Sequence, residues 1–304
     1  MSDFHSLIKP GIVHYAAFPA VFSGRGPVAE TLKVIARDAF FRAVEIAWVQ
    51  DPDERLRVGR IVEVSGLEVT YSALPAMMTH NLDISSLDEG ERRKSVEALV
   101  PYMDQAKQIG AIGFAVLSGP DANPESRGRA KCALARSLAE LCEAGGPRGL
   151  EVLMEVFDRS LQRKKLIGPA GDAADVARTV VKDHKNFGLV VDHGHIPLLG
   201  ETPLQALTPV APYLRRVHIG NCVVEDRSHP RWGDSHPRIG IPGGANGVCE
   251  CAHFLETCVQ VGYLRHGKPR VVGLEVKPDE TEDPELVIAA SKRALLEAWS
   301  LMAA

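Results

Sequence analysis

Short apolar runs alternate with longer amphipathic segments along the chain, and this alternation restricts the possible folds more than any other feature. The apolar runs are rich in Val, Ile and aromatic residues, as expected of buried strands. We predict strands at 11–18, 43–49, 67–74, 111–117, 150–157, 187–192, 215–220 and 270–276. The spacing of apolar residues between them predicts helices at 27–39, 53–64, 88–109, 126–144, 173–184, 202–210, 249–262 and 284–301.

Eight strands alternating with eight helices in 304 residues predict an α/β fold, a single (β/α)8 TIM barrel that occupies residues 1–304 as one domain. A doubly wound open sheet is the competing fold. It is disfavoured because no GxGxxG motif follows the first strand and no Walker A motif occurs. Residues 221–247, after the seventh strand, have no helical period, so we interpret them as a long loop insertion.

The composition is that of an ordinary globular protein, with 45% hydrophobic and 24% charged residues. A net charge of −4 argues against a nucleic-acid partner, and the short basic run 163–165 is interpreted as a solvated face. The sequence has no secretion signal and no apolar stretch long enough to span a membrane. The six cysteines form no CxxC pair, so we expect reduced thiols, no membrane partner and a cytoplasmic location.

Titratable residues stand at the ends of four consecutive predicted strands: Glu155, Asp192, His218 and Glu275. In a (β/α)8 barrel these ends converge on one mouth. Each residue alone has a plain structural explanation, as a capping or solvated carboxylate, a turn residue or a core histidine. Together, however, three buried carboxylates would repel one another. We therefore predict that the four residues bind one divalent metal ion, with Mn²⁺ favoured and Mg²⁺, Co²⁺ or Zn²⁺ as alternatives.

The motifs around these residues resemble those of the xylose-isomerase-like barrel superfamily, which includes D-tagatose 3-epimerase and related ketose 3-epimerases. The matching stretches are "EVFDR" with Glu155, "DHGH" with Asp192 and His195, "HIGN" with His218 and "LEV" with Glu275. The resemblance implies that these Glu, Asp, His and Glu residues bind the metal. It also implies that Glu155 and Glu275 form the catalytic acid/base pair, that His195 contacts a substrate oxygen, and that the protein forms a homodimer or homotetramer.

This set of residues suits proton transfer at a carbon next to a carbonyl. Loss of that proton gives an enediolate, whose negative charge is stabilised by a cation on the adjacent oxygens. One carboxylate removes the proton, and a second on the opposite face returns it. We therefore expect a divalent-metal-dependent sugar isomerase or epimerase that acts on a ketose or keto-sugar derivative, a small-molecule carbohydrate substrate.

Two departures from the ketose 3-epimerase pattern argue against a plain ketohexose held in the usual manner. Those relatives carry a second glutamate six residues after the first, where this chain has Leu161. Their arginine that soon follows the seventh-strand histidine corresponds only loosely to Arg227, nine residues after His218. Within 221–247, Arg227 and His236 are candidate contacts to an acidic or phosphorylated substrate. The alternative is a loop that only packs on the barrel or at a subunit contact.

Three further residues are candidate substrate contacts near the predicted mouth. His14 is placed on the first strand, His80 follows the third strand, and Lys277 lies two residues after Glu275 on the same strand face. For each, a packed or solvent-exposed side chain is the alternative.

Other functions fit the same fold. A metal-dependent lyase would eliminate the aglycone from 3-keto-glycosides or C-glycosides, or decarboxylate keto sugar acids. A metallohydrolase resembling type IV AP endonucleases would need three metals, more histidine ligands and a basic DNA-binding face, and the charge and the ligand set argue against it. A sugar-binding barrel without catalysis would bind metal and sugar but show no turnover.

Overall fold

The strands form the closed barrel that the alternation predicts. In the computed structural model, which describes residues 4–302, eight parallel strands pair in chain order and the last pairs with the first. They are β1 (Ile8–Val13), β2 (Ala43–Ala47), β3 (Glu68–Ser72), β4 (Gly113–Leu117), β5 (Glu151–Val156), β6 (Phe187–Asp192), β7 (Leu214–Gly220) and β8 (Arg270–Glu275). The chain is therefore a single (β/α)8 TIM barrel, and the fold prediction is confirmed.

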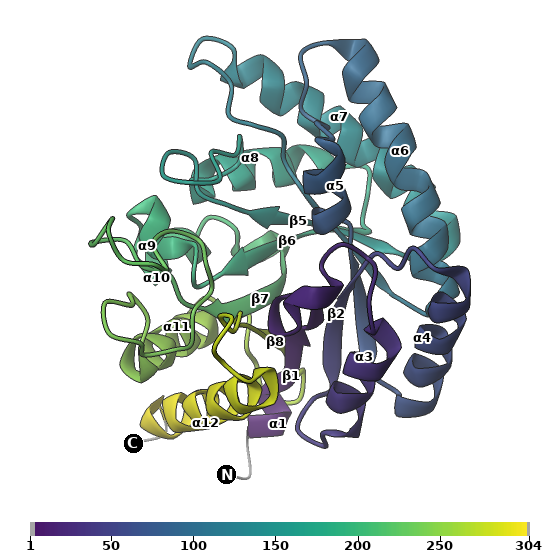
Figure 1. Cartoon of the computed structure of the whole chain (residues 1–304). Helices are drawn as coiled ribbons and strands as arrows, with labels where there is room; N and C mark the ends of the chain where they lie inside the picture. Colours follow the sequence, from purple (N-terminus) through teal and green to yellow (C-terminus); the bar gives the residue numbers. More distant parts are fainter. Residues whose placement is uncertain (1–3, 303–304) are drawn as a thin grey trace.

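Amphipathic helices surround the barrel (Figure 1). The longer ones are α3 (Val28–Arg37), α4 (Pro52–Ser65), α6 (Glu89–Gln108), α7 (Arg127–Gly145), α8 (Ala170–Val180), α11 (Val248–Gln260) and α12 (Pro284–Met302). Shorter helices are α1 (Phe4–Leu7), α2 (His14–Ala17), α5 (Leu74–His80), α9 (Ile196–Leu199), α10 (Pro203–Leu207) and the 3₁₀ turns η1 (Pro19–Val21), η2 (Gly146–Arg148) and η3 (Ala211–Tyr213). Within residues 4–302, no helix combines the length and apolar character that crossing a bilayer requires.

Side-chain caps explain why two of the best-predicted helices begin where they do. The Asp51 carboxylate accepts from the backbone N–H groups of Asp53 and Glu54 at the start of α4, and Asp88 accepts from Glu91 N at the start of α6. The helix α8 has no such cap, and it begins at Ala170, whereas the predicted helix begins at 173.

The first strand is displaced from its predicted position at 11–18, because β1 ends at Val13 and His14 begins α2. Pro10 locally disfavours this earlier start, since proline cannot donate to a strand ladder. Its carbonyl nevertheless accepts a bond from Arg42 N at 2.8 Å, so the connection toward the second strand is kept. The prediction that His14 lies on the first strand is therefore wrong.

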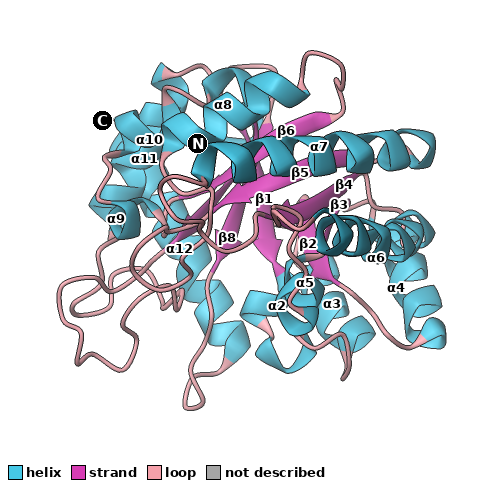
Figure 2. Cartoon of the chain, turned by 90° about the horizontal axis from the view of Figure 1, so that it is seen from above, coloured by secondary structure: helices cyan, strands magenta, loops and turns pink. Residues whose placement is uncertain are grey.

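The inner face of β7 carries polar groups toward both ends of the barrel. Arg216 donates to Thr70 Oγ1 on β3 at 3.0 Å and pairs with Glu68 Oε1, also at 3.0 Å. His218 follows two residues later and so faces the same way. An ion pair thus fills the interior at the amino end of the strands, whereas the carboxyl end presents His218. Figure 2 shows the strands in the middle of the molecule, with helices around them.

Candidate functional site

Glu155, Asp192, His218 and Glu275 converge at the carboxyl ends of β5, β6, β7 and β8. One potential ligand atom from each lies within 4.8 Å of those of the other three. The His218 Nδ1 atom is 2.9 Å from Glu275 Oε2 and 3.7 Å from both Glu155 Oε1 and Asp192 Oδ2. All four residues are buried. This spacing suits a cation held about 2.0–2.2 Å from each ligand atom.

The hydrogen bonding of these residues fits a metal ligand set. Glu155 Oε1, Asp192 Oδ2, His218 Nδ1 and Glu275 Oε2 are each buried, and no group in the described part of the chain meets them with hydrogen-bond geometry. The other ring nitrogen of His218 lies 3.4 Å from Glu45 Oε2, and Tyr15 donates to Glu45 Oε1 at 3.0 Å. A metal-binding histidine commonly directs its second nitrogen at a carboxylate in this way.

Without a cation, the surroundings of Glu155, Asp192 and His218 favour the protonated form of each of these side chains. Burial raises the pKa of Glu155, and the nearby charge of Glu275 adds to this rise. Burial likewise raises the pKa of Asp192. Burial alone would lower the pKa of His218, but the nearby carboxylates of Glu155, Glu275 and Glu45 raise that pKa well above the usual range. Protons thus balance part of the negative charge here, a task that a divalent ion would perform when bound.

Two glycines make room for the Asp192 carboxylate. Its Oδ1 atom accepts from Gly194 N. A Cβ atom on Gly194 or on Gly220 would lie 2.9 Å from this same oxygen, closer than side chains allow. Gly194 has no positive φ, so the requirement at this position is space. The glycine of the "DHGH" motif is explained by the approach of the carboxylate to the backbone.

A buried carboxylate in the loop after β7, Asp234, joins three basic side chains. Its Oδ1 lies 3.2 Å from His195 Nε2 and 2.7 Å from His236 Nε2, and its Oδ2 accepts from Arg163 Nε at 2.6 Å. Burial would raise the pKa of Asp234, but the two histidines hold it well below the usual range. His195 also donates from Nδ1 to the Val156 carbonyl at 2.8 Å. Both ring nitrogens of His195 therefore face protein groups.

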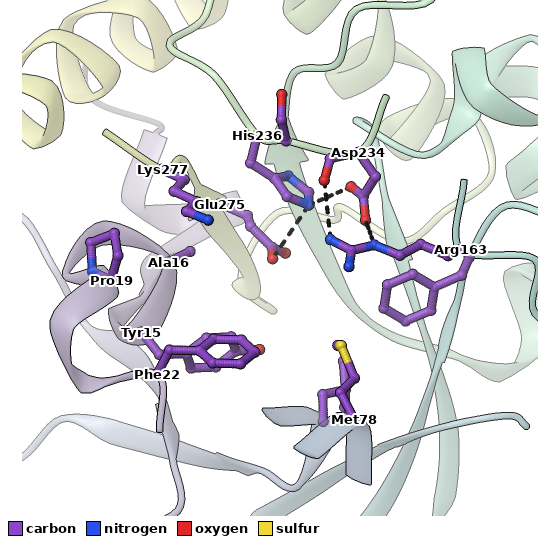
Figure 3. Close-up of a pocket in the computed structure, with 13 residues that line it drawn as sticks. Tyr15, Ala16, Pro19, Phe22, Met78, Arg163, Asp234, His236, Glu275 and Lys277 are labelled. Atoms are coloured by element: carbon purple, nitrogen blue, oxygen red, sulfur yellow. Dashed lines mark hydrogen bonds and ion pairs between the residues drawn. The ribbon is translucent and has the colours of Figure 1, made fainter. Parts of the chain in front are cut away.

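A cavity of about 290 Å³ opens beside Glu275 (Figure 3). Two of the predicted substrate contacts, His236 and Lys277, line it, together with Asp234 and Arg163. The interpretation of 163–165 as a solvated face is wrong for Arg163, whose guanidinium turns inward to Asp234. The wall also contains Tyr15 and other large apolar side chains.

Three predicted substrate contacts lie elsewhere. His14 is buried, with Nε2 2.8 Å from Thr31 Oγ1 of α3. The ring of His80 packs edge-on against Trp48 in a separate surface groove. The Arg227 guanidinium lies over the Trp232 ring, 5.6 Å from its centroid, and is exposed. Their proposed contact with substrate stays a prediction, and these packing partners offer a structural role for each.

The sequence of the chain matches the profile of the family described as "Xylose isomerase-like TIM barrel" over residues 34–297. The chain belongs to this family. The resemblance found in the strand-end motifs is therefore confirmed. No curated protein is significantly similar to this xylose isomerase-like barrel in sequence.

Solved structures give the same fold at low sequence identity. A D-tagatose 3-epimerase-like protein is 16% identical, with a TM-score of 0.71, covering 97% of this chain and 98% of that one. The IolI protein with a binding zinc atom is 14% identical, with a TM-score of 0.73, covering 97% and 99%. A 3-keto-D-glucoside 4-epimerase from E. coli is 18% identical, with a TM-score of 0.64, covering 96% and 99%.

In this xylose isomerase-like barrel, segment 221–247 is held by hydrogen bonds within itself and to the ends of neighbouring strands. All of its residues are described, and they contain no helix or strand. Asn246 donates to the carbonyls of His193 and Gly220, at 3.1 and 3.0 Å. Arg231 donates to the carbonyls of Ser235 and Lys277, at 2.8 and 2.7 Å. The loop insertion is ordered by these bonds, which carry Asp234 and His236 to the cavity.

Glu45, Asp234 and Arg163 are the site residues that sequence reasoning missed. Glu45 is a lone carboxylate inside an apolar strand, which is a signal that could have identified it. Asp234 stands in the pattern Asp-x-His with His236, but its place depends on how the loop folds back. No local sequence pattern indicated that the Arg163 side chain turns inward. Its direction depends on the fold of the loop around Asp158, whose carboxylate accepts from the backbone N–H groups of residues 161–163.

The Asp234→Asn variant is expected to lose about 3–5 kcal/mol of unfolding free energy, as found when one partner of a buried ion pair is removed. The side chain is 1% exposed, so the basic groups around it would lose a charge that water cannot replace. Urea denaturation measures the loss. Asp226→Asn, at an exposed position of the same loop, is the matched control. A value for Asp234→Asn within about 0.5 kcal/mol of the control would contradict the prediction.

Proposed function

We propose that this protein is a divalent-metal-dependent isomerase or epimerase that moves a proton beside the carbonyl of a keto sugar. One observation carries the proposal: Glu155, Asp192, His218 and Glu275 each direct a buried atom without a hydrogen-bond partner among the described residues into the same small space. Relatives of this fold whose names describe sugar epimerases add support. When bound, a divalent cation there would stabilise negative charge on the substrate oxygens.

The two glutamates are the proposed acid and base. Glu275 lines the cavity, whereas Glu155 lies deeper and is 2% exposed. They belong to β8 and β5, with two strands between them, so they approach a substrate at the barrel mouth from different sides. One is proposed to take the proton from the carbon and the other to return a proton, on the opposite face or at the neighbouring carbon.

Mn²⁺ is the metal that we propose. Three carboxylates and one imidazole form a mostly hard ligand set, which suits Mn²⁺ or Mg²⁺ and offers no thiolate. Zn²⁺ is the main competitor, because the similar IolI protein was solved with a zinc atom. Metal analysis of protein purified without added metal, followed by activity after reloading with each ion, distinguishes these cases.

Solvent exchange tests the proposed reaction. The Mn²⁺-loaded protein is incubated in D₂O with ketoses, 3-keto-glycosides and keto sugar acids, and the mixtures are followed by NMR. We expect deuterium at the carbon next to the carbonyl, together with an isomeric product. Release of an aglycone or of CO₂ would instead assign a lyase. Metal and sugar binding without exchange or product would contradict catalysis.

A further inference from the structure

The cavity beside Glu275 has two chemically different sides (Figure 3). Hydrogen-bonding groups come from the strand ends and loops of the second half of the chain, including Arg163, His236 and Lys277. The opposite side comes from the segments after β1 and β3. Its large members are Tyr15, Phe22, Leu74 and Met78.

The apolar side has little to offer a hydroxyl group. Tyr15 is its one member with a polar atom, and that hydroxyl donates to Glu45 Oε1 and lies 3.0 Å from Ser72 Oγ. Tyr15 therefore presents its ring to the cavity. Phe22 is 37% exposed even though it is a large aromatic residue. An aromatic ring left accessible beside a polar site is a surface that a ligand can cover.

A free ketose carries a hydroxyl on almost every carbon that is not the carbonyl. Where such hydroxyls lie against Phe22 and Met78, they lose water without gaining a hydrogen bond, which weakens binding. An apolar substituent at that place gains from leaving water. The polar side, by contrast, still provides charged and hydrogen-bonding groups for the sugar ring beside Glu275.

The space beyond the cavity is also larger than one sugar ring needs. A second, more open cavity of about 580 Å³ shares Pro19, Ser235 and Lys277 with the first. The two cavities therefore adjoin at these residues, so the space around the site extends past the first cavity.

We propose that the substrate is a keto sugar that carries an aromatic or alkyl substituent, and that Phe22 and Met78 select for this substituent. The inference rests on the proposed function, because it places the sugar part beside Glu275. It names Phe22 and Met78 as specificity-determining residues, which act by covering the substituent and take no part in proton transfer.

Affinities for a matched ligand series test the proposal. Isothermal titration with the Mn²⁺-loaded full chain gives Kd for the methyl, butyl and phenyl 3-keto-glucosides. Because burial of an aromatic ring is strongly favourable, we expect phenyl to bind about ten- to a hundredfold more tightly than methyl, with butyl in between. Phe22→Ala and Met78→Ala should each reduce the phenyl-to-methyl ratio severalfold. Leu204→Ala, at a 44% exposed leucine on α10, is the matched control and should keep the ratio.

Equal affinity for the three ligands, or an unchanged ratio in both Phe22→Ala and Met78→Ala, would overturn the proposal. Deuterium exchange, measured on the same ligands, separates this outcome from failure of the proposed function. A preference for phenyl without any exchange would leave the substituent site standing and reject the proton-transfer reaction. Exchange without a preference for phenyl would support the proton-transfer reaction and reject the substituent site.

Discussion

Replacement of Glu155 or Glu275 by glutamine is expected to slow deuterium exchange beside the substrate carbonyl by about 10²- to 10⁴-fold, the usual contribution of a positioned acid or base. Glutamine keeps the shape and an oxygen ligand but cannot take up a proton at ordinary pH. Because both glutamates are also proposed metal ligands, metal content must be measured for each variant. The informative comparison is between protein samples that hold equal metal.

The two variants should also differ from each other. If each glutamate serves one face of the sugar, Glu155→Gln should lose exchange mainly with one epimer and Glu275→Gln mainly with the other. Glu256→Gln, an exposed glutamate of α11, should behave as the wild type. Full turnover in both metal-loaded variants would show that neither residue is the acid or base.

The candidate metal-binding cluster was predictable because a barrel brings the ends of successive strands together in space. Glu155, Asp192, His218 and Glu275 each end a parallel strand, and neighbouring strands of a closed barrel bring their ends together. Except at the first strand, the predicted strand ends lie within two residues of the observed ones. The prediction of which side chains lie together therefore needed only the fold class and the alternation of side chains along a strand.

The groups around the four-residue cluster, such as Asp234, were not predictable by the same argument. Asp234 reaches His195 and Arg163 only because segment 221–247 folds back over the barrel through many small contacts. No periodicity specifies such a path. The displaced first strand shows a related limit, since Pro10 disfavours a strand locally whereas barrel closure with β8 requires one. Contacts between distant parts of the chain determine both the path of segment 221–247 and the position of β1.

Metal binding provides the second large expected effect. At a free concentration about 100 times its Kd, Mn²⁺ should raise the unfolding free energy of the wild type by about 2.7 kcal/mol, because the ion binds the folded chain only. Asp192→Asn should lose most of this gain. Asp192 is fully buried and supplies Oδ2 to the cluster, while its Oδ1 bond to Gly194 N can be kept by the asparagine oxygen.

The expected effect of Asp192→Asn on the stability of the metal-free protein makes this prediction specific. In the metal-free cluster, burial and the charge of Glu275 raise the pKa of Asp192, so Asp192→Asn removes an unfavourable charge and should leave the metal-free protein at least as stable as the wild type. Asp234→Asn breaks a pair with basic partners and should destabilise the protein with and without Mn²⁺. Urea denaturation of both variants, with Mn²⁺ and with chelator, measures the four values. Equal Mn²⁺ stabilisation of Asp192→Asn and the wild type would exclude Asp192 as a ligand, since a lost carboxylate must weaken binding of a divalent ion at this spacing.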